Sequence, residues 1–187
     1  MLLSAGGKTT AEDVLSGVDL TGKNCIVTGP NSGIGLETAR ALANHGARVF
    51  LPCRSLDKAE AAKKDIERTK PDALLTPMVL DLNDVDSVRA FAAQIDVPVH
   101  ILVCNAGVMA TPPGTVTKQG FEAQVGVNHL AHFLLVNLLL PRLKEAGGAR
   151  VVAVSSMGHR LIKTPDWISS PRLSTPEYDP WYALGLP

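Results

Sequence analysis

Short apolar stretches alternate with longer amphipathic stretches along most of the chain. Five short stretches are mostly apolar and have the length of strands: residues 25–28, 47–51, 74–80, 99–104 and 150–155. Four longer stretches carry apolar residues at helical spacing: residues 35–45, 55–69, 84–95 and 120–144. Buried strands that alternate with helices predict a parallel sheet covered on both faces. The pattern therefore predicts a doubly wound α/β fold.

Residues at the ends of these stretches indicate where helices start and stop. Ser55 is the expected cap of the helix at 55–69, and Asn83 that of the helix at 84–95. Gly147 and Gly148 are expected to end the long helix.

The chain divides into three segments. Residues 1–20 form a lead-in with a short helix near 11–15, and residues 21–156 form the α/β domain. Residues 157–187 contain five prolines with tryptophans and tyrosines between them, which predicts a loop tail.

Composition narrows the class of protein. A chain of 187 residues with 45% hydrophobic and 19% charged residues suits one globular domain, or the front part of a larger protein. The 18 basic and 18 acidic side chains cancel without a run of like charge, which excludes the electrostatic pattern of a nucleic-acid binder. No uninterrupted apolar run approaches the ~20 residues that cross a bilayer. We therefore expect no integral membrane segment, and a small-molecule partner in a pocket.

Cysteine and histidine positions argue against a disulfide framework and a metal site. Cys25, Cys53 and Cys104 are scattered and form no C-x-x-C pair, so buried free thiols are expected. His129 and His132 stand three apart without a nearby cysteine or carboxylate, which favours structural histidines. The first ten residues lack a secretory signal, and we expect a cytoplasmic protein.

A glycine-rich turn follows the first predicted strand and leads directly into a helix. Glycines let the backbone approach a pyrophosphate, whose charge is met by free amides and the helix dipole. A glycine turn without a ligand is the alternative, whereas an ATP-binding P-loop is excluded because no Gly-Lys-Ser/Thr follows. The turn predicts a dinucleotide site that uses Thr28, Gly29, Asn31, Ser32, Gly33, Ile34 and Gly35.

The end of the second predicted strand bears on the cofactor. NAD enzymes tend to place a carboxylate there, whereas a guanidinium suits the 2′-phosphate of NADP. The chain has Arg54 at this position and no carboxylate nearer than Asp57. This favours NADP, with NAD as the alternative cofactor and a solvated surface arginine as the competing interpretation of Arg54.

The spacing Gly-x-x-x-Gly-x-Gly resembles the cofactor signature of the short-chain dehydrogenases/reductases. Four further motifs fit that family in order: Asp81-Leu82, Cys104-Asn105-Ala106-Gly107, Asn128-His129 and Val154-Ser155-Ser156. The resemblance spans residues 20–156. Residues 31–39, Cys53-Arg54 and residues 128–133 look most like the branch of retinol dehydrogenases and WW-domain oxidoreductases.

The resemblance implies roles for these motifs. Asp81, followed by Leu82, would accept a hydrogen bond from the adenine amino group, although an aspartate after a strand is also a common helix cap. Asn105, with Ala106 and Gly107, would support the cofactor from the fourth strand, and a plain turn role is the alternative.

The resemblance also implies two catalytic residues in this chain and leaves two positions unmatched. Ser156 matches the serine that holds the substrate oxygen, and Asn128 the asparagine that anchors a water; their alternatives are a turn serine and a locally bonded asparagine. The general acid would be a tyrosine with a lysine four residues later, but Tyr178 and Tyr182 lack such a lysine, and the alignment places Leu184 at the tyrosine position.

We therefore expect a C-terminally truncated chain whose sheet is incomplete on that side and whose fifth strand is an edge. Apolar residues of the long helix, Val136, Leu139 and Leu140, would then be exposed and favour a homo-oligomer. Two functions stay open. One is an NADP-preferring oxidoreductase acting on an alcohol/carbonyl pair, and the other is an NADP-binding fragment or regulatory module without chemistry.

Overall fold

A computed structural model describes residues 9–156 of the chain. The strands are β1 (Asn24–Val27), β2 (Arg48–Cys53), β3 (Leu75–Val79), β4 (Ile101–Cys104) and β5 (Arg150–Ala153). The helices are α1 (Ala11–Leu15), α2 (Gly33–Asn44), α3 (Leu56–Glu67), α4 (Val85–Ala93), α5 (Ala123–Val125), the π-helical segment η1 (Gly126–Leu130) and α6 (Ala131–Glu145). The predicted loop tail at 157–187 lies outside the described residues.

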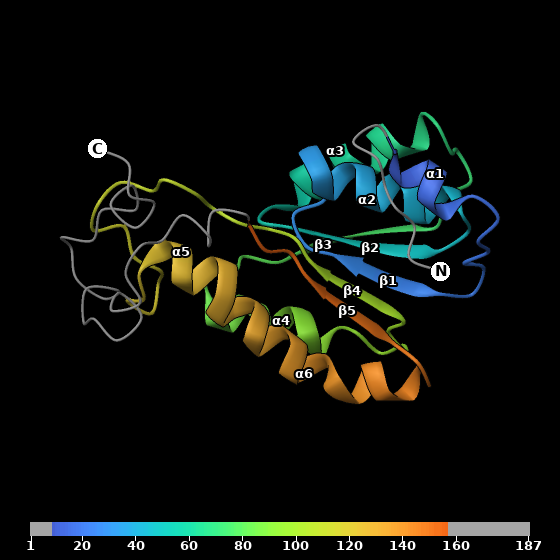
Figure 1. Cartoon of the computed structure of the whole chain (residues 1–187). Coiled ribbons are helices and arrows are strands. Elements are labelled where there is room, and N and C mark those ends of the chain that lie inside the picture. The colour runs from blue at the N-terminus through green and yellow to red at the C-terminus, as the bar shows by residue number, and fades with distance from the viewer. Residues whose placement is uncertain (1–8, 157–187) are drawn as a thin grey trace.

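The five strands form one parallel sheet in the order β3-β2-β1-β4-β5. The chain moves outward from β1 through β2 to β3, and then crosses back to place β4 on the other side of β1 (Figure 1). The order therefore reverses at β1, and ligands of open α/β sheets bind at such a reversal, beside the carboxyl ends of the strands. The predicted doubly wound fold is confirmed.

Helices cover both faces of the sheet, and the alternation of side chains along β1 shows why. Cys25 and Val27 pack in the core under α2 and α3, whereas Ile26 packs in the core with α4 and α6. Figure 1 shows these two pairs of helices on opposite sides of the strands. Since all three residues are fully buried, β1 needs the continuous apolar run that its sequence has.

The long apolar helix starts later than predicted and is not a single regular helix. Glu122 caps it by accepting from the amides of Gln124 and Val125, and the segment from Gly126 to Leu130 is π-helical. Gly126 packs so closely on Thr117 that an added Cβ would lie 2.3 Å from Thr117 Cγ2. A pattern of apolar positions does not register this local change in winding.

The segment Ala123–Glu145 has 23 residues and contains an 18-residue window with a mean hydropathy of 1.4, so it is long and apolar enough to cross a membrane by length and composition alone. Such a score is weak evidence, because the core helix of a globular domain meets it too. Leu135 and Leu139 are fully buried in the core shared with α4 and the sheet. The prediction that Leu139 is exposed is therefore wrong, whereas Leu140 is 41% exposed.

Three further local predictions are corrected. The cap of α4 is Asp84 rather than Asn83, because the Asp84 carboxylate accepts from the Asp86 amide. Ser55 precedes α3 as predicted but its side chain makes no capping hydrogen bond. The fifth strand was predicted to be buried, yet all residues of β5 are exposed. Among the described strands β5 pairs only with β4, and it forms the expected edge.

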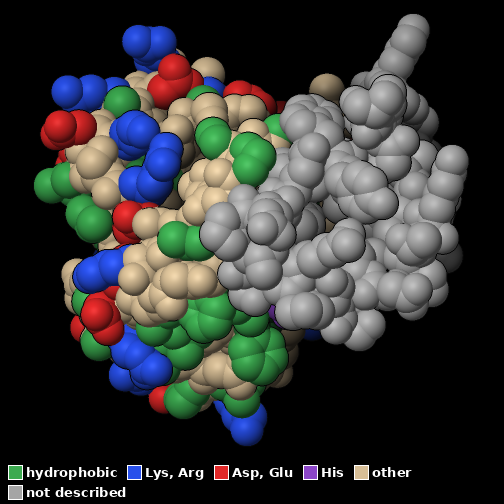
Figure 2. Space-filling model, turned by 90° about the vertical axis from the view of Figure 1, so that its left-hand side faces the viewer, with side chains coloured by type: hydrophobic (Ala, Val, Ile, Leu, Met, Phe, Trp, Pro, Cys, Tyr) green, Lys and Arg blue, Asp and Glu red, His purple; other side chains and the backbone are tan. Residues whose placement is uncertain are grey.

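Charged side chains of both signs are interspersed over the part of the surface that Figure 2 describes, with apolar side chains between them. This mixture agrees with the formal net charge of zero. Polar contacts hold α1 against the end of α2, where Glu12 Oε1 accepts from the Asn44 side-chain amide and Glu12 Oε2 lies 3.1 Å from His45 Nε2.

Candidate dinucleotide site

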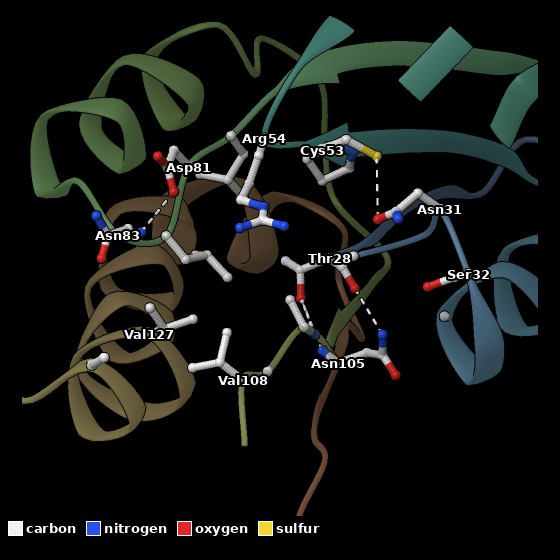
Figure 3. A pocket seen from close by; sticks show the side chains of 18 of the residues that line it. Thr28, Asn31, Ser32, Cys53, Arg54, Asp81, Asn83, Asn105, Val108 and Val127 are labelled. Atoms are coloured by element: carbon white, nitrogen blue, oxygen red, sulfur yellow. Dashed lines mark hydrogen bonds between the residues drawn. The ribbon is translucent and has the colours of Figure 1, made fainter. Parts of the chain in front are cut away.

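A cavity of about 750 Å³ lies at the carboxyl ends of the strands, beside β1 (Figure 3). The segments that follow β1, β2, β3 and β4 all contribute to its walls. Every residue predicted to contact the cofactor lines it except Gly33: Thr28, Gly29, Asn31, Ser32, Ile34, Gly35, Arg54, Asp81, Leu82, Asn105, Ala106 and Gly107. Other walls come from Cys53, Asn83, Val108 and Val127.

The glycine turn between β1 and α2 is shaped by close approach at one end and by open space at the other. A Cβ on Gly35 would lie 2.3 Å from the Gly29 carbonyl oxygen and 2.4 Å from Asn105 Nδ2, so this position accepts no side chain. Gly33 has a φ of +54° and nothing within 4 Å of its missing Cβ. The turn is therefore packed where it meets β4 and uncovered where α2 begins.

The first turn of α2 presents backbone donors. Ser32 is its N-cap residue, but the Ser32 side chain makes no capping hydrogen bond. Among residues 9–156, no acceptor is recorded for the amides of Gly33 and Ile34. Free amides at the positive end of a helix dipole favour an anion, and the neighbouring turn residues line the cavity. The donors and the open surface at Gly33 fit a pyrophosphate.

Thr28 joins the ends of β1 and β4. Its hydroxyl oxygen accepts from the amides of Asn105 and Ala106, each at 2.9 Å, and the Asn105 side-chain amide donates to the Thr28 carbonyl oxygen at 2.9 Å. Thr28 is fully buried. Asn105 thus ties the two strand ends together, which is the turn role, and its support of the cofactor stays a prediction.

Arg54 follows β2, and its guanidinium points into the cavity (Figure 3). Among the described residues the Arg54 guanidinium forms no ion pair. The neighbouring Cys53 thiol lies 3.9 Å from Asn31 Oδ1. Burial raises the pKa of the Cys53 thiol to about 11, so the cavity has a free cation but an unreactive cysteine beside it. All three cysteines are buried and free, as predicted.

Asp81 shapes the wall after β3. Its Oδ1 accepts from the Asn83 amide at 2.9 Å, and its own amide donates to Ser87 Oγ at 2.9 Å. Asp81 therefore makes a local turn in the cavity wall, while the capping of α4 falls to Asp84.

The two predicted catalytic residues lie outside the lining of the cavity. Asn128 sits in η1, where its side chain donates to the Val108 carbonyl oxygen and accepts from the Val108 amide, each at 2.8 Å. Asn128 thus fixes Val108, which does line the cavity. Ser156 is exposed beyond β5. Tyr178, Tyr182 and Leu184 lie outside the described residues.

Sequence reasoning missed a polar residue that supports this site. His132, on α6, is 5% exposed, and its Nε2 lies 2.9 Å from the Thr28 hydroxyl oxygen. The sequence favours structural histidines at positions 129 and 132 over a metal site, but it does not predict the contact of His132 with Thr28. Among residues 9–156, no group of three or more His, Cys, Asp or Glu side chains is placed to hold a metal ion.

Residues 23–164 match the sequence model of short chain dehydrogenases. The chain belongs to the short-chain dehydrogenase family. It is 49% identical over 149 residues to retinol dehydrogenase 11 of Mus musculus, covering 78% of this chain and 47% of that protein. It is 44% identical over 184 residues to the WW domain-containing oxidoreductase of Homo sapiens, covering 95% of this chain and 44% of that protein. The predicted family and branch are confirmed, and the chain spans about half the length of these relatives.

Solved structures of the short-chain dehydrogenase family share the fold. An uncharacterized protein from Mycobacterium paratuberculosis matches with a TM-score of 0.73 and 40% identity, covering 94% of this chain and 60% of that one. A metagenomic short-chain oxidoreductase in complex with NADP matches with a TM-score of 0.64 and 31% identity, covering 78% and 66% of the two chains. The cavity therefore lies in a fold whose relatives include a nicotinamide dinucleotide complex.

Proposed function

We propose that this chain is an NADP-preferring oxidoreductase of the short-chain dehydrogenase family acting on an alcohol/carbonyl pair. The observation that carries the cofactor preference is the Arg54 guanidinium, which points into the cavity at the end of β2. A 2′-phosphate bonded to a guanidinium gains charge-assisted hydrogen bonds that a 2′-hydroxyl does not offer. The NADP complex of a structural relative supports the same choice.

Residues in the cavity lining and residues outside it have separate roles in this proposal. The amides of Gly33 and Ile34 bind the pyrophosphate, and Asp81 lies on the adenine side near Arg54 (Figure 3). When bound, the nicotinamide ring supplies or accepts the hydride. By family resemblance, Ser156 holds the substrate oxygen. Asn128 fixes Val108 in the cavity wall through its two hydrogen bonds to the Val108 backbone.

A second candidate function is NADP binding without chemistry. The observation that favours it is in the sequence: neither tyrosine of the 187 residues, Tyr178 or Tyr182, has a lysine four positions later. Loss of a general acid costs ~10²–10⁴-fold in rate. Both candidates require the same cofactor site, and they differ in whether reduction of a carbonyl follows.

Titration with NADPH, followed by its fluorescence, tests the shared cofactor site. We expect saturable binding, and we expect Arg54→Gln to weaken it roughly 10–100-fold, because a hydrogen bond to a charged group is worth about 1.5–3 kcal/mol. NADH binding should be unchanged in this variant. Absence of a response at near-millimolar NADPH would contradict both candidates.

Turnover then separates the two candidates. The chain is incubated with NADPH and a panel of aldehydes and retinoids, and NADPH oxidation is recorded. Oxidation that is lost in Ser156→Ala while NADPH still binds supports the oxidoreductase. Binding without oxidation supports the cofactor-binding module.

A further inference from the structure

The contact between Thr28 and His132 joins the end of β1 to α6 behind the cavity. Thr28 is fully buried and His132 is 5% exposed, so water does not substitute for the bonds they make. The two atoms that meet are Thr28 Oγ1 and His132 Nε2, at 2.9 Å. Both nitrogens of the ring are engaged, since Nδ1 lies 3.1 Å from the carbonyl oxygen of Asn128.

Counting protons around Thr28 fixes the direction of this contact. The hydroxyl oxygen accepts from the amides of Asn105 and Ala106, and these two bonds use both of its lone pairs. Its single hydrogen is left to donate, and His132 Nε2 at 2.9 Å is a closer acceptor than the Val103 carbonyl oxygen at 3.4 Å. Nε2 therefore carries no proton.

The other ring nitrogen completes the assignment. A carbonyl oxygen only accepts, so Nδ1 must donate to Asn128 O. His132 is thus the neutral Nδ1–H tautomer. Burial lowers the pKa of His132 below its usual value and outweighs the hydrogen bond to the Asn128 carbonyl oxygen, which raises it; this agrees with a neutral ring.

We propose that His132 is a positioning residue for the dinucleotide site, acting through the Thr28 hydroxyl. The neutral ring holds the hydroxyl hydrogen, and both hydroxyl lone pairs then face the amides of Asn105 and Ala106, whose residues line the cavity. Protonation of His132 Nε2 would place two hydrogens between this nitrogen and Thr28 Oγ1, and the hydrogen bond between them would break. This inference rests on the proposed function, because the wall that His132 orders is the cofactor wall.

Few other titratable groups face this contact. On α4, which packs against α6, Asp86 and Arg89 are exposed. On β4, burial raises the pKa of Cys104 to about 11, so its thiol stays neutral. His129 stands one turn before His132. Among residues 9–156, the recorded hydrogen bonds of the Thr28 hydroxyl involve His132 and backbone groups alone. We therefore assign the response of this contact to acid to His132.

The first experiment determines the tautomer in the 187-residue chain without cofactor. Long-range ¹H–¹⁵N correlation of the His132 ring should show a proton on Nδ1 and none on Nε2 at neutral pH. A proton on Nε2 would overturn the proposal. Exchange of the Asn105 and Ala106 amides with solvent should be faster in His132→Leu than in the parent chain, and equal exchange would overturn it too.

The second experiment measures NADP⁺ affinity by calorimetry from pH 7.5 to pH 5, since the oxidised cofactor survives acid. His132→Gln is the matched variant, because its side chain accepts from Thr28 and donates to Asn128 without titrating. Between pH 7.5 and pH 5 we expect the NADP⁺ affinity of the parent chain to fall by roughly tenfold more than that of His132→Gln. A factor of ten corresponds to the loss of about one hydrogen bond. Titration of the cofactor's own phosphate affects both chains equally and cancels in this comparison. Parallel pH profiles would overturn the proposal.

His132→Leu removes the acceptor outright. Roughly tenfold weaker NADP⁺ binding at neutral pH, with affinity restored in His132→Gln, supports the positioning role. Equal affinity in a folded His132→Leu chain contradicts it. A parent chain that binds no NADP⁺ would defeat the proposed function, while the tautomer and the amide exchange would still decide the role of His132.

Discussion

The Thr28 hydroxyl oxygen lies 2.9 Å from His132 Nε2, across 104 positions of sequence. The same oxygen holds the amides of Asn105 and Ala106 at the end of β4. One buried side chain therefore connects β1, β4 and α6 at the point where the strand order reverses. We expect the stability of the fold and the proposed cofactor binding to depend on this connection.

Replacement of Thr28 by valine should destabilise the fold more than its small change in shape suggests. Valine keeps the volume but leaves the part-buried amides of Asn105 and Ala106 without this acceptor, and a fully buried amide left unsatisfied costs about 1–3 kcal/mol. We expect a loss of roughly 1–3 kcal/mol in the free energy of unfolding, measured by urea denaturation. Thr28→Ser keeps the hydroxyl and should lose much less. Equal losses in the two variants would show that the hydroxyl does not hold the strand ends.

Gly35→Ala should lower the free energy of unfolding, because the added Cβ would clash with the neighbouring backbone and not because the backbone of Gly35 is in an unusual conformation. The added Cβ would meet the Gly29 carbonyl oxygen at 2.3 Å, and the α2 helix must shift to admit it. Such overpacking costs about 1–3 kcal/mol. Gly148→Ala is the control, since nothing lies within 4 Å of its missing Cβ. A midpoint of thermal unfolding that is the same in both variants would contradict the close packing of the turn.

Arg54→Asp should invert the cofactor preference. A carboxylate at the end of β2 repels a 2′-phosphate and accepts from a 2′-hydroxyl, so NADPH affinity should fall by at least 100-fold, roughly 3 kcal/mol, while NADH affinity is kept or improved. Fluorescence titration with each cofactor measures both values. Arg89→Asp makes the same charge change at an exposed position of α4 and should leave both affinities unchanged. An equal loss of affinity for NADPH and NADH would contradict the proposal that Arg54 contacts the 2′-phosphate of the ribose.

Acid stability should depend on the pair of Asp84 and Lys118. The hydrogen bond from Lys118, followed by that from Gln119, lowers the pKa of Asp84 to about 2. A carboxyl whose pKa is lowered on folding stabilises the protein above its unfolded value of 3.8, and this contribution is lost as the pH falls from about 4 to about 2.

The measurement compares the parent chain with Lys118→Met by thermal unfolding across that range. The difference between their midpoints should be largest at neutral pH, a few degrees at most, and should shrink toward pH 2. Lys63→Met is the control, because Lys63 approaches Glu67 only to 3.8 Å within α3. A difference that does not change with pH would mean that Lys118 acts by packing and not through the Asp84 carboxylate.

Much of the fold follows from the sequence alone because burial imposes local periodicity. Strands such as β1 are buried on both faces, which requires continuous apolar runs, and the helices between them show one apolar face. The glycine turn is equally local, since the 2.3 Å approach at Gly35 leaves no room for a side chain. The order of the elements and the place of the cavity were therefore predictable.

Tertiary structure alone decided which polar groups meet. Asp84 rather than Asn83 caps α4, since the Asp84 carboxylate also bonds Lys118 and Gln119 from a distant loop. Gly126 sits where the helix becomes π-helical against Thr117. His132 reaches Thr28 only because α6 packs on the sheet beside β4. Periodicity records which residues are buried, whereas a hydrogen bond needs a partner at a fixed distance and direction, and only the packing of the whole chain supplies that partner.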